Sequence, residues 1–190
     1  MIASPLQPLN PEAFDQRKAQ HLLQRVGFGG TPKQSQALAD LGLEKAVDYI
    51  INYQDLPDPN PTSLDDYDKD IIRPATQSER AAIRVARQNG NEDMVEMFRN
   101  ERQRRQRADR KQIAEMERWG FQRMVSTPRP FEEKLTLFWH GHFATGYRGI
   151  EDSYHMYLQN LFFRENAMGN FKEDLVRGII HDPAMIRYLN

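Results

Sequence analysis

No stretch of this 190-residue chain alternates apolar and polar side chains with the period of two that a half-buried β-strand requires. Nearly every segment instead repeats its apolar residues at helical spacing and is bounded by capping residues, prolines or glycines. We therefore predict an all-α protein, built as a multi-helix orthogonal bundle with one long, partly solvent-exposed Arg-rich helix and no significant sheet.

Residues typical of helix N-termini locate the starts of the predicted helices along the chain. Asn10 is followed by Pro11, which is typical of an N-cap with proline at the first helical position, and this helix should end at Gly27. Similar signals occur at Thr31-Pro32, Thr76-Gln77-Ser78-Glu79, Asn170-Phe171-Lys172-Glu173 and Asp182-Pro183. We expect a single helical domain over residues 1–190, within which residues 54–75 form an Asp/Pro-rich loop.

Composition excludes several classes of site. The chain has no cysteine, so it can hold no disulfide, thiolate metal site or cysteine nucleophile, and this leaves the compartment open. No apolar run is long enough to span a bilayer, and the first residues show no signal peptide. The formal net charge is -1, so a charged partner would have to be attracted by a local patch.

Such a patch is predicted at Arg99 to Lys111, which holds seven basic and two acidic residues and has Ala108 as its only apolar side chain. A helix that is polar on all sides cannot pack in a core, so we expect it to stand in solvent. Its arginines are spread around the helix with few aromatic residues between them, which makes nucleic acid an unlikely partner. A protein partner on this helix is an alternative, as are intramolecular ion pairs with aspartates of Asp55 to Asp70.

The segment FEEKLTLFWHGHF, Phe131 to Phe143, carries two of the five histidines. If one helix runs through both, His140 and His142 diverge by about 200° and cannot bind one metal ion. They converge only if the backbone turns at Gly141, which is a residue suited to ending a helix. The residues leave two interpretations open: histidines packed at the edge of a core, or a metal or acid/base site.

A divalent metal ion at His140 and His142 would need a further ligand. Glu133 has nearly the same azimuth as His140 but lies about 10.5 Å away along a helix, too far to share an ion directly. The candidates are His155, Glu133 acting through a second metal or a water, and acidic residues from outside this chain. As an acid/base site, the same segment would use Glu133 and His140.

Several segments together resemble the bacterial proteins of the domain of unknown function 1800 family. The resemblance runs from about Lys18 to Asn190, and its most specific mark is the Trp-His-Gly-His-Phe segment. The matching segments are AQHLLQRVGFGGTP, RWGFQRM, EEKLTLFWHGHFATG, QNLFFRENAMGNFKEDL and HDPAMIRYLN.

The resemblance implies a mostly α-helical protein without an established activity, commonly at least twice this length and often exported. In full-length relatives, an Asn- and Glu-rich motif follows the segment that corresponds to MIRYLN. The chain therefore resembles an N-terminal fragment, and the carboxylates of that motif would be partners for His140 and His142.

Three functions are compatible with these observations. The leading hypothesis is a metal-dependent or acid/base site, of a hydrolase or redox enzyme, built on Trp139 to Phe143 and completed by a C-terminal half. The alternative is a non-catalytic structural or protein-interaction module. The third is nucleic-acid binding through Arg99 to Lys111.

Overall fold

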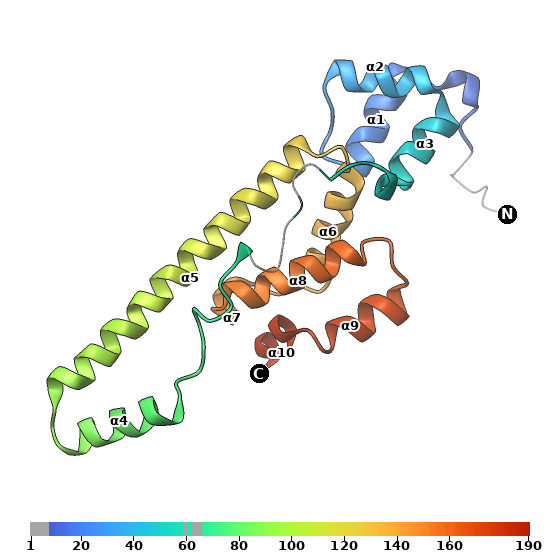
Figure 1. The fold of residues 1–190 in the computed structure, drawn as a ribbon. Coiled ribbons are helices and arrows are strands. Elements are labelled where there is room, and N and C mark those ends of the chain that lie inside the picture. The colour runs from blue at the N-terminus through green and yellow to red at the C-terminus, as the bar shows by residue number, and fades with distance from the viewer. Residues whose placement is uncertain (1–7, 59–60, 62–65) are drawn as a thin grey trace. The chain divides into compact units, whose positions relative to one another are not determined.

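The computed structural model of the chain describes residues 8–58, 61 and 66–190, and these contain ten α-helices and no strand. The all-α prediction is confirmed (Figure 1). The α-helices are α1 (Gln16–Val26), α2 (Pro32–Leu41), α3 (Leu43–Ile51), α4 (Gln77–Gln88), α5 (Glu92–Ser126), α6 (Pro130–His142), α7 (Tyr147–Ile150), α8 (Ser153–Glu165), α9 (Arg177–Ile179) and α10 (Pro183–Leu189). Short helices η1 (Pro11–Ala13), η2 (Tyr53–Asp55) and η4 (Phe171–Val176) lie between them.

The capping predictions hold at most helix starts. Thr31 begins α2 and Thr76 begins α4, and each forms a complete capping box with the residue three positions later, so that two backbone N–H groups are satisfied. The prediction that one helix runs from Asn10 to Gly27 was wrong, because Asn10 caps only the short helix η1. The first long helix starts after Asp15, whose carboxylate accepts from the Lys18 backbone N–H at 2.9 Å.

The chain divides into two compact units, residues 1–61 with 121–139 and residues 62–120 with 140–190. In the first unit, helices α1, α2 and α3 pack around a small apolar core of Ala19, Leu38, Ala46 and Ile50. Phe131, near the start of α6, packs against this core and meets the Tyr53 ring edge to face. The prediction of one domain stays a prediction, because two compact units can belong to a single domain.

In the second unit, Ile113 of α5 packs with Ile150, Met156 and Ala184 from α7, α8 and α10. The helix predicted after Asn170 begins as π-helix η4, in which the Leu175 N–H bonds to the Asn170 carbonyl five residues back. This wider turn changes which side chains face inward. Leu175 and Ile179 are buried as predicted, whereas Phe171, predicted to face inward, is exposed.

Helix α5 contains the arginine run, and most of Arg99 to Lys111 lies in solvent as predicted, but Asp109 is buried. Ion pairs in this run join Arg104 and Arg105 to Glu101 and Lys111 to Glu115 on the same helix, with a longer contact of 4.0 Å from Arg105 to Glu79 on α4. The predicted aspartate loop is described only in part, because residues 59, 60 and 62–65 lie outside the described residues. None of the described helices combines the length and apolar character needed to cross a membrane.

Candidate functional site

Helix α6 runs without a break through Gly141 to His142, so the turn that a shared histidine site requires is absent from this segment. Gly141 is not among the glycines with positive φ. Successive residues of an α-helix are rotated by about 100°, so the two imidazoles are directed to nearly opposite sides of α6.

His140 packs on the next long helix of the second unit. Its Nε2 lies 3.0 Å from the Asn160 amide nitrogen, and its ring meets Phe163 edge to face with centroids 4.8 Å apart. Burial, followed by the nearby charge of Arg164, lowers the pKa of His140 to about 4. His140 is therefore a neutral imidazole at neutral pH.

The proton on His140 can be placed from its neighbours. Arg164 has only donors, and its Nη2 lies 3.4 Å from the Asn160 side-chain oxygen. The Asn160 amide nitrogen therefore faces His140 and donates to Nε2, which leaves the proton on Nδ1. The lone pair that a metal ion would take at Nε2 is thus occupied by the Asn160 amide.

His142 has a different environment. It is exposed, and its ring lies edge to face against Phe143 and Phe171, at centroid distances of 4.9 and 5.6 Å. Phe138, on the same helix, is also exposed. His142 therefore contacts aromatic rings, as expected for a histidine at the edge of a core, but its side chain is exposed.

Glu133, predicted as a catalytic residue, is part of a buried ion cluster in the first unit. The Arg123 guanidinium donates to Glu133 at 2.7 Å, to Glu132 at 3.1 Å and to Asp58 at 2.7 Å. Burial lowers the pKa of Arg123, but its hydrogen bonds with Asp58 and Glu133 outweigh this and raise it, so Arg123 is charged. Glu133 is 1% exposed, which suits a structural carboxylate better than one that contacts a substrate.

His155, one of the candidates for a third ligand, lies at the start of α8. Its Nδ1 is 3.5 Å from Asp152, the N-cap of the same helix, which also pairs with Arg187 at 3.2 Å. Within residues 8–58, 61 and 66–190, no group of three or more His, Asp or Glu side chains is arranged to hold a metal ion. The metal and acid/base roles of His140, His142 and Glu133 therefore stay predictions that need ligands from elsewhere.

A buried polar cluster around Asp109 was not predicted from the sequence. This carboxylate, 2% exposed, accepts from Ser153 Oγ at 2.6 Å, from the Ser153 backbone N–H at 2.8 Å and from the Tyr147 hydroxyl at 2.7 Å. Gln112 extends it by donating to Ser153 Oγ at 3.0 Å. The sequence feature that could have indicated this cluster is the spacing of Asp109, Gln112 and Ile113, which share one side of a helix whose neighbouring residues are mostly basic.

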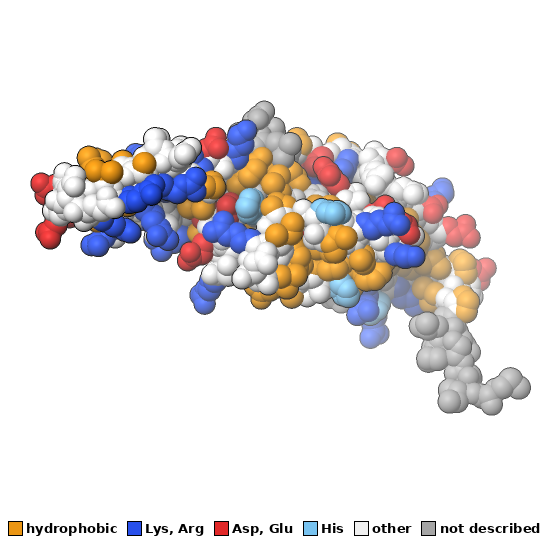
Figure 2. All heavy atoms as spheres, turned by 90° about the horizontal axis from the view of Figure 1, so that it is seen from below, with side chains coloured by type: hydrophobic (Ala, Val, Ile, Leu, Met, Phe, Trp, Pro, Cys, Tyr) orange, Lys and Arg blue, Asp and Glu red, His pale blue; other side chains and the backbone are white. Residues whose placement is uncertain are grey.

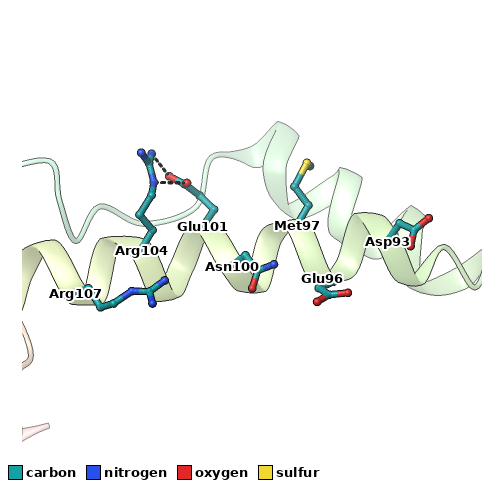
Figure 3. Close-up of a pocket in the computed structure, with 7 residues that line it drawn as sticks. All are labelled: Asp93, Glu96, Met97, Asn100, Glu101, Arg104 and Arg107. Atoms are coloured by element: carbon teal, nitrogen blue, oxygen red, sulfur yellow. Dashed lines mark hydrogen bonds and ion pairs between the residues drawn. The ribbon is translucent and has the colours of Figure 1, made fainter.

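An open hollow of about 590 Å³ lies on the solvent side of α5. Figure 3 shows its side chains on one helix, with Met97, Glu101 and Arg104 along one edge and Glu96, Asn100 and Arg107 along the other. Asp93 closes its N-terminal end. Because the lining is charged and open to solvent, this hollow suits contact with a macromolecule better than enclosure of a small ligand.

Comparison with known proteins gives a family without an assigned activity. No curated protein and no solved structure matches the chain. A family model described as "Protein of unknown function (DUF1800)" matches residues 21–190, which include the arginine run and both histidines of α6. The chain therefore belongs to the DUF1800 family of proteins of unknown function.

Proposed function

We propose that this chain acts as a protein-interaction module, and that α4 with the first turns of α5 binds an acidic segment of a partner protein. We call residues 77–108 the arm. The observation that carries the proposal is a row of three arginines, Arg80, Arg84 and Arg87, on one exposed face of α4. Within the described part of the chain, no ion pair involves any of the three.

The spacing of these arginines fits a linear partner. They are four and three residues apart, so they share one side of α4 over about 10.5 Å of helix. Guanidinium groups bind carboxylates with two parallel hydrogen bonds, which makes arginine better suited than lysine to recognising Glu and Asp side chains. Figure 2 shows Lys and Arg side chains gathered over α4 and the first half of α5.

A protein fits this surface better than a nucleic acid. The large apolar side chains exposed on the arm are Val85, Met94 and Met97, which are aliphatic or thioether groups that pack against protein side chains. Phe98, the aromatic residue of the arm, is half-buried and so does not present its ring for base stacking.

The test uses a fluorescent, glutamate-rich helical peptide and measures its binding by anisotropy. We expect the charge-reversed variant Arg80→Glu/Arg84→Glu/Arg87→Glu to bind the peptide about tenfold or more weakly than the wild-type chain. The matched control is Arg17→Glu/Arg25→Glu/Lys33→Glu, which makes the same change in net charge at exposed positions of α1 and α2.

Two results would contradict the proposal. Equal loss of binding in both triple variants would show attraction by net charge alone. Tighter binding of single-stranded DNA than of the peptide, with a steep salt dependence that the α4 variant removes, would assign the surface to nucleic acid instead.

A further inference from the structure

The hollow on α5 has an ordered arrangement of charge. Its two edges form two rows: Asp93, Met97, Glu101 and Arg104 in the first, Glu96, Asn100 and Arg107 in the second (Figure 3). Within the first row, Glu101 is already paired with Arg104 and Arg105 of its own helix. Each row carries a carboxylate at its N-terminal end and a guanidinium at its C-terminal end. The face of α5 over the hollow is thus negative at one end and positive at the other.

This charge order is symmetric about Asn100. Glu96 and Asp93 stand four and seven residues before it, whereas Arg104 and Arg107 stand four and seven residues after it. Offsets of four and seven residues return to the same side of a helix, about 6 and 10.5 Å from the centre. Each carboxylate before Asn100 is therefore matched by a guanidinium at the same distance along the helix axis after Asn100.

We propose that this face binds a second copy of the chain, with the two α5 helices antiparallel about a two-fold axis at Asn100. A two-fold contact uses the same patch on both copies, so the patch must be complementary to itself when reversed. The α5 face meets this condition, because reversal brings each acidic end against a basic end. A parallel pair in register would place like charges together and is disfavoured.

The two rows of side chains on α5 determine which residues form ion pairs between the two copies. In an antiparallel two-fold pair, each row faces the same row of the second copy. Asp93 therefore meets Arg104 of the second copy, and Glu96 meets Arg107 of the second copy. In each pair the two positions are offset by about 4.5 Å along the helix, which the long, flexible arginine stem can cover.

The remaining contacts are compatible with this arrangement. Met97 is 56% exposed and would pack on the arginine stem of the opposite copy. Arg104 already holds Glu101 of its own chain at 2.9 and 3.1 Å, but a guanidinium has five donors and can bind two carboxylates. Because the seam is short and mostly polar, we expect a weak, salt-sensitive dimer.

This inference goes beyond the proposed function. Both surfaces lie on the arm, but the acidic partner is proposed to bind through the arginines of α4, whereas the second copy is proposed to bind through the acidic and basic ends of the α5 rows. Peptide binding that depends on the α4 arginines and self-association that depends on the α5 rows can therefore fail separately, and each assay reports on its own surface.

The first experiment is sedimentation velocity of the chain at low salt, over concentrations up to about 1 mM. We expect reversible dimerisation that weakens about tenfold or more in Asp93→Arg/Glu96→Arg and in Arg104→Glu/Arg107→Glu. Mixing these two variants should give a 1:1 heterodimer, and the quadruple variant that carries all four changes should dimerise again. A monomer throughout, or a quadruple variant that stays monomeric while folded, would overturn the proposal.

The second experiment tests the orientation by disulfide trapping, which the absence of native cysteine makes specific. Mild oxidation of an equimolar mixture of Asp93→Cys and Arg104→Cys should give mainly the mixed disulfide. Asp93→Cys oxidised alone should stay largely uncrosslinked, because its two copies lie far apart in the antiparallel pair. Efficient crosslinking of Asp93→Cys alone would indicate a parallel pair and would contradict the two-fold axis at Asn100.

Discussion

The two units of this protein bury charge in different ways. In the first, Arg123 lies among Glu132, Glu133 and Asp58, so that formal charges of opposite sign face one another inside the unit. In the second, Asp109 receives hydrogen bonds from neutral donors, and His140 is kept uncharged. Burial and the hydrogen bond to Asp109 raise the pKa of Tyr147, which keeps that donor a neutral phenol.

This difference determines what each unit tolerates. Removing one partner of a buried ion pair leaves an uncompensated charge in a poorly solvated place, whereas removing one neutral donor leaves a carboxylate that still has others. The first unit should therefore be the more sensitive to loss of one buried polar group. The second should be the more sensitive to any change that forces a charge onto a neutral group.

The largest expected effect is in the first unit. We expect Arg123→Met to destabilise it by about 3 to 5 kcal/mol, because Glu132 and Glu133 would lose a shared cation at buried positions. Urea unfolding can be followed unit by unit, since Trp139 belongs to the first unit and Trp119 to the second. Trp119→Phe and Trp139→Phe backgrounds would isolate each fluorescence signal.

The matched change in the second unit is Asp109→Asn, which keeps the side-chain shape and removes the charge. We expect a smaller cost, about 1 to 3 kcal/mol, since the amide oxygen can still accept one or two of the three hydrogen bonds. If Asp109→Asn lowered the free energy of unfolding as much as Arg123→Met does, the expected difference between the two units would be contradicted.

Protonation of His140 tests the second unit directly, and its expected cost is at the upper end of the range given for Asp109→Asn. The pKa of His140 is about 4 in the folded chain, against an ordinary value of 6.5, so the unfolded chain binds this proton more tightly. The contribution of neutral His140 is complete above pH 6.5 and is lost as the pH falls towards 4, by about 3 kcal/mol in all. His140→Gln, whose amide oxygen can still accept from Asn160, should flatten stability over this range.

His142→Gln serves as the control for that experiment, because His142 is the exposed histidine of the same helix. Wild-type, His140→Gln and His142→Gln chains would be unfolded with urea at several pH values between 4 and 7. If the two variants lost the same pH dependence, or if neither did, the buried neutral state of His140 would be contradicted.

Local sequence signals predicted the helices well and the side-chain partners poorly. The helix caps at Thr31 and Thr76 depend on residues within one turn, so the sequence was enough to locate them. The contacts of Asp109 with Ser153 and of His140 with Asn160 join residues far apart in the chain. No periodicity along one helix specifies such pairs, because they depend on how helices pack.

The same limit explains the candidate site. Spacing showed that His140 and His142 could share an ion only if Gly141 ended the helix, but glycine is compatible with either outcome. Pro130 and the residues after it start α6, and the helix continues to His142 because nothing in the chain stops it at Gly141. The conformation of this one residue therefore decides between the packed and the metal-binding interpretation.

The smallest expected effect addresses that residue. A Cβ built at Gly141 meets nothing within 4 Å, and its φ is not positive, so Gly141→Ala should stabilise the chain by about 0.5 to 1 kcal/mol, as alanine does in a helix interior. Gly42→Ala is the control, since a Cβ there also meets nothing within 4 Å, as at Gly141 in the last turn of α6, but the φ of +78° at Gly42 disfavours alanine. Urea unfolding should give opposite signs for the two variants. If Gly141→Ala destabilised the chain as Gly42→Ala does, the backbone would turn at Gly141, and His140 and His142 would regain the geometry of a shared metal site.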